Sequence, residues 1–252
     1  MGEPEASLVN GWEIMRAGEQ YLSSVVKVIE RIADTQMTTI RLVGTLVGRS
    51  VVQGGIVHLF GAGHSHMVAE EVFIRAGTLA AVRAIWPQQI STKFERAEGL
   101  GSCVLALGDV REGEVLFIIS NSGINPLPLD VALEGRKRGA TTVGVGSKAH
   151  SESVNSRHSS GKRLLDVCDY FLDTCVPAGD ALLEIPGLKW QVGPGSTIAS
   201  VAAVQAVMTE AVGWMIEQGY EPAVRVSRNL PEGDAHNDAL AKQYQIRIPE
   251  LG

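Results

Sequence analysis

The sequence predicts an α/β protein of three layers, α/β/α, with a mainly parallel five-stranded sheet of the flavodoxin type preceded by two N-terminal helices. From Ile56 onward, short apolar runs alternate with amphipathic stretches, which is the rhythm of a parallel sheet covered by helices on both faces. The 252 residues are 45% hydrophobic, enough for one sizeable core. We therefore expect a single domain over 1–252, with a helical extension at 1–55, a core at 56–218 and a C-terminal segment at 219–252.

Residues 10–53 carry two amphipathic helical patterns that end at Gly54-Gly55. The two apolar stripes are Leu22, Val25, Val26 and Ile29, and then Ile40, Val43, Val47 and Val51. The chain up to Gly55 contains six acidic and five basic residues, which is not the charge pattern of a nucleic-acid-binding module. We expect both helices to pack on the core or across a dimer interface.

Five apolar runs predict the strands of the sheet, namely 56–60, 79–85, 115–119, 141–145 and 170–174. The segment 197–218 is apolar almost all round, which predicts a buried helix, and we find no apolar run that approaches the roughly 20 residues needed to span a bilayer. The polar segment 147–162 predicts a surface loop. The charged connection 87–100 fits either a helix or a loop.

The most informative segment joins the strand at 115–119 to a helix. Ser120-Asn121-Ser122-Gly123 follows this strand, and Asn125 is placed to cap a helix that begins at Pro126. Free backbone amides, the positive end of a helix dipole and two hydroxyl groups would then face one anion. The sequence therefore predicts a phosphate-binding loop here.

Two other turns have the same character. His64-Ser65 follows the first strand, and Gly195-Ser196-Thr197 precedes the buried helix. Each turn alone fits a plain helix cap, but the carboxyl ends of parallel strands open into a shared crevice, so the three together favour an anion-binding site. A nicotinamide site is not expected, because His66 stands where the third glycine of a dinucleotide fingerprint belongs.

These motifs resemble the sugar isomerase (SIS) domain over roughly 56–218. A Gly-x-Gly-x-Ser turn, a Ser-x-Ser-Gly loop and Gly-Pro-x-Ser-Thr before a helix carry the resemblance. The segments Ser156–Leu164 and Asp234–Asn237 also resemble a bacterial subfamily of stand-alone SIS proteins that carries no established reaction. The resemblance implies that phosphate contacts Ser65, Ser120, Ser122 and Asn125, with Asn121, Gly123 and Thr197 beside them, and that Pro194 and Ser196 approach the sugar.

The family's usual reaction is an aldose–ketose isomerisation, which needs a base for the proton next to a carbonyl. Our acid–base candidates are Glu98, on the connection after the second strand, and Glu71, about 9 Å along a helix from Ser65. His64 lies inside the first turn, where it either binds the ligand or makes a structural hydrogen bond. His236 is a candidate for ring opening, because SIS sites are often completed by a partner's histidine. Related isomerases carry a glutamate where this chain has Arg75.

The net charge of −6 argues against nucleic-acid and acidic-membrane partners. The acidic N-terminus lacks a signal-peptide pattern, and three cysteines without metal spacing fit free thiols in a reducing cytoplasm. We expect a cytoplasmic homodimer with shared active sites that acts on a sugar phosphate, an amino-sugar phosphate included, without cofactor or metal. The alternatives are a non-catalytic phosphosugar-binding regulator and an amino-sugar phosphate lyase or deaminase.

Overall fold

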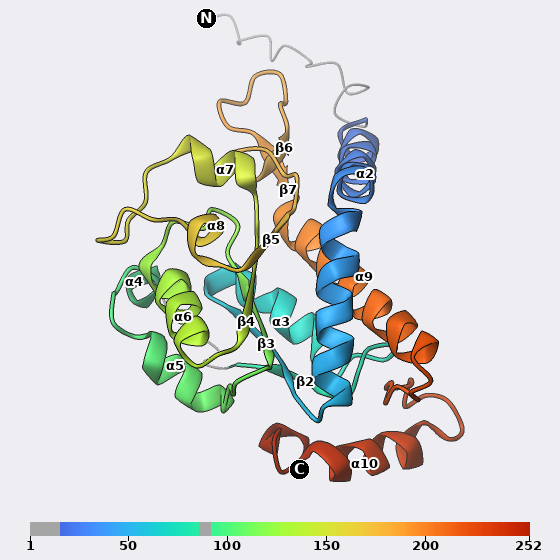
Figure 1. Cartoon of the computed structure of the whole chain (residues 1–252). Helices are drawn as coiled ribbons and strands as arrows, with labels where there is room; N and C mark the ends of the chain where they lie inside the picture. The colour runs from blue at the N-terminus through green and yellow to red at the C-terminus, as the bar shows by residue number, and fades with distance from the viewer. Residues whose placement is uncertain (1–15, 86–91) are drawn as a thin grey trace, which may run out of the picture.

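The computed structural model describes residues 16–85 and 92–252, and it shows the predicted three-layer α/β/α architecture (Figure 1). Its central sheet has five parallel strands in the order β2-β1-β3-β4-β5. They are β1 (Val57–Gly61), β2 (Val82–Ala84), β3 (Val115–Ile119), β4 (Thr141–Gly146) and β5 (Tyr170–Asp173). All five predicted strands are present, and β3 has the predicted bounds.

The sheet is covered on both faces because the strand residues alternate between two apolar clusters. Val115, Phe117 and Ile119 of β3 pack with α2 (Ala17–Val52), α3 (His66–Val72) and α9 (Ser196–Glu217). Leu116 and Ile118 face α5 (Gly101–Gly108), α6 (Pro126–Lys137) and α8 (Leu164–Val167). A strand with both faces buried is therefore continuously apolar, as its sequence indicated.

The remaining elements are short or lie at the edges of the domain. They are the helices α4 (Thr92–Glu95), α7 (Lys148–Ser153) and α10 (Gly233–Tyr244), the 3-10 turns η1 (Gly63–Ser65) and η2 (Pro249–Leu251), and an antiparallel hairpin of β6 (Ala181–Leu183) and β7 (Val192–Pro194). Helix α7 corrects the prediction of a loop over 147–162. Ser147 starts this helix because its Oγ accepts a hydrogen bond from the N–H of His150 at 3.0 Å.

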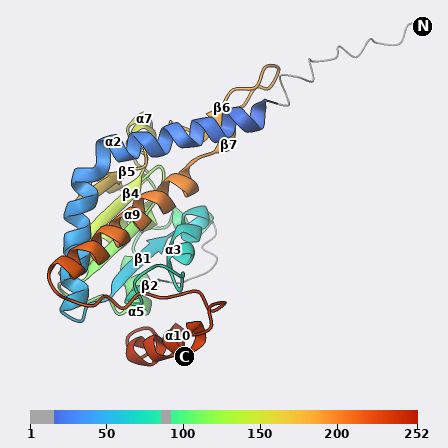
Figure 2. The same ribbon diagram turned by 90° about the vertical axis from the view of Figure 1, so that its right-hand side faces the viewer.

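The N-terminal region within the described residues is one long helix, α2, where the sequence predicted two. Figure 2 shows that α2 changes direction along its length. Within this helix, Thr35 Oγ1 donates to the carbonyl oxygen of Arg31 at 2.7 Å, a kind of side-chain bond that often bends helices. The two predicted stripes are therefore two arms of one bent helix.

The two arms of α2 differ in burial. In the second arm Ile40, Val43 and Val47 are buried, and this arm packs along α9. In the first arm Leu22 and Val26 are 65% and 54% exposed. The second stripe therefore packs on the core as expected, and Ile29 of the first stripe also packs against it. The alternative of a dimer interface for the exposed part of the first stripe stays a prediction.

Helix α9 has the length and the hydropathy that a membrane-spanning helix requires, which corrects our finding that no run approaches this length. In the structure α9 packs against α2 and α3, and eight of its residues are buried. A buried core helix of a globular domain passes the same test of length and composition.

The C-terminal segment binds the sheet near the amino ends of its strands through buried charges. Arg247 Nη2 donates to Glu114 Oε1 at 2.7 Å, and Arg83 donates to the carbonyl oxygen of Arg247 at 3.2 Å and to Glu250 at 2.7 Å. We call Arg83, Glu114 and Arg247 the C-terminal clasp. It lies at the edge of the sheet opposite to the predicted site.

Glu114 also binds the buried His58, whose Nε2 lies 2.9 Å from Glu114 Oε2. Burial lowers the pKa of His58 below its ordinary value, despite this carboxylate. Burial by itself would raise the pKa of Glu114. Hydrogen bonds from His58 and from the backbone N–H groups of Ile56 and Arg111 outweigh it and bring the pKa of Glu114 to about 2.

Candidate functional site

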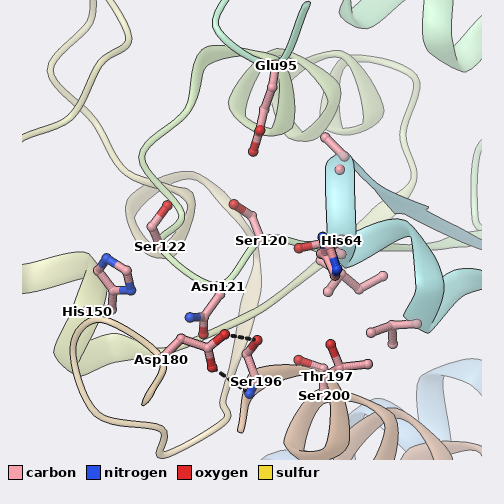
Figure 3. A pocket seen from close by; sticks show the side chains of 15 residues that line it. His64, Glu95, Ser120, Asn121, Ser122, His150, Asp180, Ser196, Thr197 and Ser200 are labelled. Carbon is pink, nitrogen blue, oxygen red and sulfur yellow. Dashed lines mark hydrogen bonds between the residues drawn. The ribbon is translucent and has the colours of Figure 1, made fainter. Parts of the chain in front are cut away.

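The three predicted turns meet in one pocket of about 350 Å³ at the carboxyl edge of the sheet (Figure 3). Seven of the residues proposed from the sequence line it, namely His64, Ser65, Ser120, Asn121, Ser122, Ser196 and Thr197. Four further polar residues line it that sequence reasoning missed, namely Glu95, His150, Asp180 and Ser200. The pocket therefore combines several hydroxyl groups with two carboxylates and two imidazoles.

The loop after β3 is tightly built. Gly123 has a left-handed φ of 60°, and its N–H donates to Ser120 Oγ at 3.2 Å. Its carbonyl oxygen accepts from the N–H of Leu164 at 2.8 Å, which ties the loop to α8. A Cβ at Gly146 would collide with the carbonyl oxygen of Ser120, so a glycine is required where β4 passes the loop. Gly123 itself does not line the pocket.

The turn after β1 is a short 3-10 helix with Gly63 at a left-handed φ of 58°. A Cβ at Gly61 would overlap the carbonyl group of Ser65, so the turn folds back closely on the end of β1. His64 and Ser65 thereby face the same pocket as the loop after β3 (Figure 3).

The N-terminus of α9 is already occupied by a carboxylate of the chain itself. Asp180 Oδ1 accepts from the N–H groups of Gly195 at 3.1 Å and Ser196 at 2.7 Å, and Oδ2 accepts from Ser196 Oγ at 2.9 Å. Asp180 adopts a left-handed φ of 72°, which is uncommon for a residue other than glycine. Because a carboxylate fills this helix end, a phosphate is better accommodated at the loop after β3.

Glu95 enters the pocket from the side opposite to Asp180 (Figure 3). Its Oε1 accepts a hydrogen bond from Asn125 Nδ2 at 2.6 Å. A Cβ at Gly63 would lie 3.8 Å from its Oε2, so this second oxygen faces the turn after β1. Glu95 thus reaches both of the loops that the sequence predicted for phosphate.

Asn125 stands at the predicted N-cap position of α6, but its side chain makes no cap hydrogen bond. The side chain instead joins Glu95 to Arg157, whose Nη1 donates to Asn125 Oδ1 at 2.7 Å. Asn125 is buried and does not line the pocket. The structure gives it contacts with a glutamate and an arginine in place of the implied phosphate contact.

His150 and Asn121 line the pocket, and each has a buried polar atom to be satisfied. Nδ1 of His150 and Oδ1 of Asn121 have no hydrogen-bond partner among residues 16–85 and 92–252. Such atoms cost free energy unless a water or a ligand satisfies them. His150 came to the site through helix α7, which the sequence did not predict.

The other residues proposed from the sequence do not line the pocket of this chain. Glu98 is exposed and accepts from the N–H and Oγ of Ser159 at 2.6 and 2.7 Å, and these two hydrogen bonds lower its pKa. Oε1 of Glu71, on α3, lies 3.3 Å from Nε of Arg75, which follows this helix. His236 Nε2 lies 2.8 Å from the carbonyl oxygen of Val224, and Pro194 accepts from the hydroxyl of Tyr21 at 2.9 Å.

Charge at the pocket comes from carboxylates and not from basic side chains. Among the lining residues that the structure describes, there is no lysine and no arginine. On α3, Nε2 of His66 lies 3.3 Å from Oε1 of Glu70. Over residues 16–85 and 92–252, no three histidine, cysteine or acidic residues group as a metal site would need.

The fold and the pocket define a class, namely α/β/α proteins with a hydroxyl-lined pocket at the carboxyl edge of a parallel sheet. This chain belongs to the SIS domain family, whose model matches residues 20–147. The match confirms the resemblance and begins within helix α2, earlier than the core at 56–218 that the motifs outlined.

Comparison with individual proteins agrees with this assignment. A UPF0309 protein of Listeria monocytogenes serotype 4b, strain CLIP80459, is 37% identical over 92% of this chain and 97% of its own length. An E. coli CFT073 protein in complex with a sugar phosphate has the same fold, with a TM-score of 0.51, 16% identity, and coverage of 84% of this chain and 95% of that one. A candidate phosphosugar isomerase involved in capsule formation from Bacteroides fragilis NCTC 9343 also has this fold, with a TM-score of 0.53 and 14% identity. The match covers 82% of this chain and 93% of that one.

Proposed function

We propose that this protein is a phosphosugar isomerase that holds the phosphate of its substrate at residues 120–123. The observation that carries the proposal is the meeting of Glu95 with two serine-bearing turns in one pocket. Such a pocket supplies neutral hydrogen-bond donors at one end and a carboxylate within reach of the sugar chain. A sugar phosphate has the matching pair of groups, a dianion and a carbonyl with an acidic neighbouring C–H.

Phosphate binding at this loop rests on dipoles and hydroxyl groups. Ser120 and Ser122 supply donors, and the loop leads into the N-terminus of α6, a 12-residue helix. Amides at a helix N-terminus carry partial positive charge and favour anions without a basic side chain. Asp180 occupies the competing helix end at α9, which leaves the loop after β3 as the better phosphate position.

For the reaction, Glu95 is the base in this proposal. Its carboxylate takes the proton from the carbon next to the carbonyl, and that electron pair forms the double bond of an enediolate. The same carboxyl then returns the proton to the neighbouring carbon, so that the aldose and the ketose interconvert. In this proposal His64, which lines the same pocket, carries the proton between the two oxygens. His236 remains a prediction that requires a second subunit.

Two of the proteins compared above support the proposal, one through its bound ligand and the other through its description. The E. coli protein of this fold was solved with a sugar phosphate, and the Bacteroides protein is described as a candidate phosphosugar isomerase. A cytoplasmic homodimer with shared sites also belongs to our proposal.

The first test is a thermal-shift screen with arabinose 5-phosphate, ribose 5-phosphate, fructose 6-phosphate and glucosamine 6-phosphate, each beside its unphosphorylated parent. A ligand at 100 times its Kd stabilises the fold by about 2.7 kcal/mol. We expect a shift with a phosphorylated sugar and none with its parent. Absence of any shift would contradict phosphate binding at this pocket.

The second test asks whether Glu95 acts in the reaction. We expect Glu95→Gln to bind the sugar phosphate found in the screen with little change and to lose at least ~100-fold in kcat, because proton transfer by a positioned side chain contributes roughly 10²–10⁴-fold. Glu217→Gln, at an exposed position at the far end of α9 and outside the pocket, is the control and should keep wild-type turnover. Binding without turnover in the wild type would favour the regulator, and release of ammonia would favour a deaminase.

A further inference from the structure

Glu95 stands on a small element with little apolar anchoring. Helix α4 has four residues, and Phe94 beside Glu95 is 58% exposed. Several polar contacts join the described part of this segment to the rest of the protein, and Leu100 at its end packs partly against the apolar cluster around α5 and α6. Besides the bond of Glu95 to Asn125, the carboxylate of Glu98 binds Ser159, and the N–H of Gly99 donates to Asp130 Oδ2 at 2.6 Å. The direction of the Glu95 side chain therefore depends on these hydrogen bonds, which hold its segment in position.

Arg157 holds the oxygen side of the Asn125 amide whose nitrogen binds Glu95. A guanidinium only donates hydrogen bonds, and its Nη1 donates to the oxygen Oδ1 of Asn125 at 2.7 Å. The amide nitrogen then faces Glu95 and donates to its carboxylate at 2.6 Å, the orientation that a carboxylate, which only accepts, also requires. Without Arg157 the Asn125 side chain loses the partner on its other side, and Glu95 is bound to an amide that is held from one side only.

Arg157 is itself held to the phosphate loop. Its backbone N–H donates to the carbonyl oxygen of Ile124 at 3.0 Å, directly before Asn125. Residues 154–163, which we call the 154–163 loop, thus contact the end of the phosphate loop and the segment that carries Glu95 at the same time. Arg157 is therefore hydrogen-bonded both to the end of the loop proposed for phosphate, residues 120–123, and, through Asn125, to Glu95.

We propose that Arg157 is a positioning residue for Glu95 and acts through Asn125. The inference rests on the proposed function, because it assigns Arg157 to the acid–base step of that pocket. Arg157 does not line the pocket, so its loss should leave the binding of substrate nearly unchanged and should misdirect the carboxylate. A misplacement of about 1 Å in a reacting group can cost roughly 100-fold in rate.

The kinetic test compares three variants with the sugar phosphate that the thermal-shift screen identifies. We expect Arg157→Met to lower kcat by about 10- to 100-fold with KM within twofold of wild type. Arg157→Lys keeps a cationic donor and should recover part of kcat. Arg163→Met is the matched control, because Arg163 lies in the same loop and donates to the carbonyl oxygen of Val154 at 3.0 Å without contacting Asn125. Equal losses in Arg157→Met and Arg163→Met would overturn the proposal in favour of a general role in folding of the loop.

A second readout needs no substrate. In ¹⁵N-labelled protein, the side-chain amide signals of Asn125 should shift in Glu95→Gln and should broaden or move in Arg157→Met, while Arg163→Met leaves them in place. Asn125 signals that do not respond to Glu95→Gln or to Arg157→Met would overturn the positioning role whatever the kinetics. If the wild type turns over none of the sugar phosphates, the proposed isomerase function fails alone, and these signals still decide whether Arg157 orients Asn125 toward Glu95.

Discussion

At the scale of single residues, Ser120 and Ser122 are the side chains that our proposal assigns to phosphate binding, and both line the pocket. Replacing both by alanine should weaken binding of a sugar phosphate by about 2–4 kcal/mol, because hydrogen bonds to charged groups contribute roughly 1.5–3 kcal/mol each and do not add fully. Isothermal titration with the ligand from the thermal-shift screen measures this loss.

A serine outside the pocket separates this effect from a general loss of stability. Ser102 lies exposed on α5, so Ser102→Ala should bind as the wild type does. An unchanged affinity in the Ser120→Ala/Ser122→Ala variant would place the phosphate elsewhere in the pocket. The N-terminus of α9, where Asp180 now binds, would be the next position to examine.

The pocket residues that the sequence predicted are those whose position follows from their immediate neighbours in the chain. Ser120 and Ser122 directly follow a continuously apolar strand. Because ligands bind at the carboxyl ends of parallel strands, this position alone predicts that both serines lie at the pocket. Glu95 and Asp180 have no such local signal. Glu95 reaches the pocket through a bond to Asn125, 30 residues later, and Asp180 through a helix end 15 and 16 residues later. Glu98 was chosen from the same connection, three residues from the glutamate that lines the pocket.

At the scale of elements, helices α2 and α9 approach each other closely at a glycine. A Cβ at Gly44 would lie 2.7 Å from Glu210 Cβ and 3.2 Å from backbone atoms of Val207 and Ala211. Gly44→Ala should therefore destabilise the protein by about 1–3 kcal/mol through overpacking. The loss is read from urea unfolding followed by circular dichroism.

Gly213 provides the control on helix α9 itself. Nothing lies within 4 Å of a Cβ at this position, and its φ is not left-handed. Gly213→Ala should stabilise the protein by about 0.5–1 kcal/mol, because alanine loses less backbone entropy in a helix. If Gly44→Ala were also stabilising, the close packing of α2 on α9 described here would be wrong.

The sequence predicted elements correctly where burial determines whether a strand or helix forms. It predicted them less well where the formation of an element depends on a single side chain. The five strands follow from continuous apolar runs, because both faces of a central strand are covered. Helix α2 is continuous over Ala17–Val52, whereas its sequence carries two separate apolar stripes that do not show that one helix joins them. Helix α7 needed Ser147 as its cap, in a segment whose polar composition predicted a loop.

At the scale of the whole molecule, the C-terminal clasp makes stability depend on pH. The pKa of Glu114 falls from its ordinary 4.5 to about 2 in the folded protein, so the folded state holds this proton less tightly than the unfolded chain does. Glu114 therefore contributes stability above about pH 4.5 that is lost as the pH falls toward 2. At one pKa unit per 1.36 kcal/mol, the contribution is on the order of 3 kcal/mol.

Glu114→Gln tests this contribution. The variant should be less stable at pH 7 and should lose less stability than the wild type between about pH 4.5 and 2, as measured by urea unfolding at several pH values. The pKa of His58 is lowered in the folded protein, so the protein also loses stability as the pH falls below about 6.5. This loss begins at a higher pH than the loss due to Glu114, which separates the two. A wild-type protein whose stability is flat from pH 4.5 to 2 would contradict the role of the clasp.

The makeup of the pocket wall also has a consequence for how fast a ligand is captured. The chain carries a net charge of −6, and the described lining residues include two carboxylates and no lysine or arginine. The net negative charge and the carboxylates of the described lining oppose the approach of a dianion, so electrostatic steering does not speed the encounter with the sugar phosphate that we propose as ligand. Tight binding at such a site comes from a long residence time, with dipoles and hydroxyl groups that act after contact.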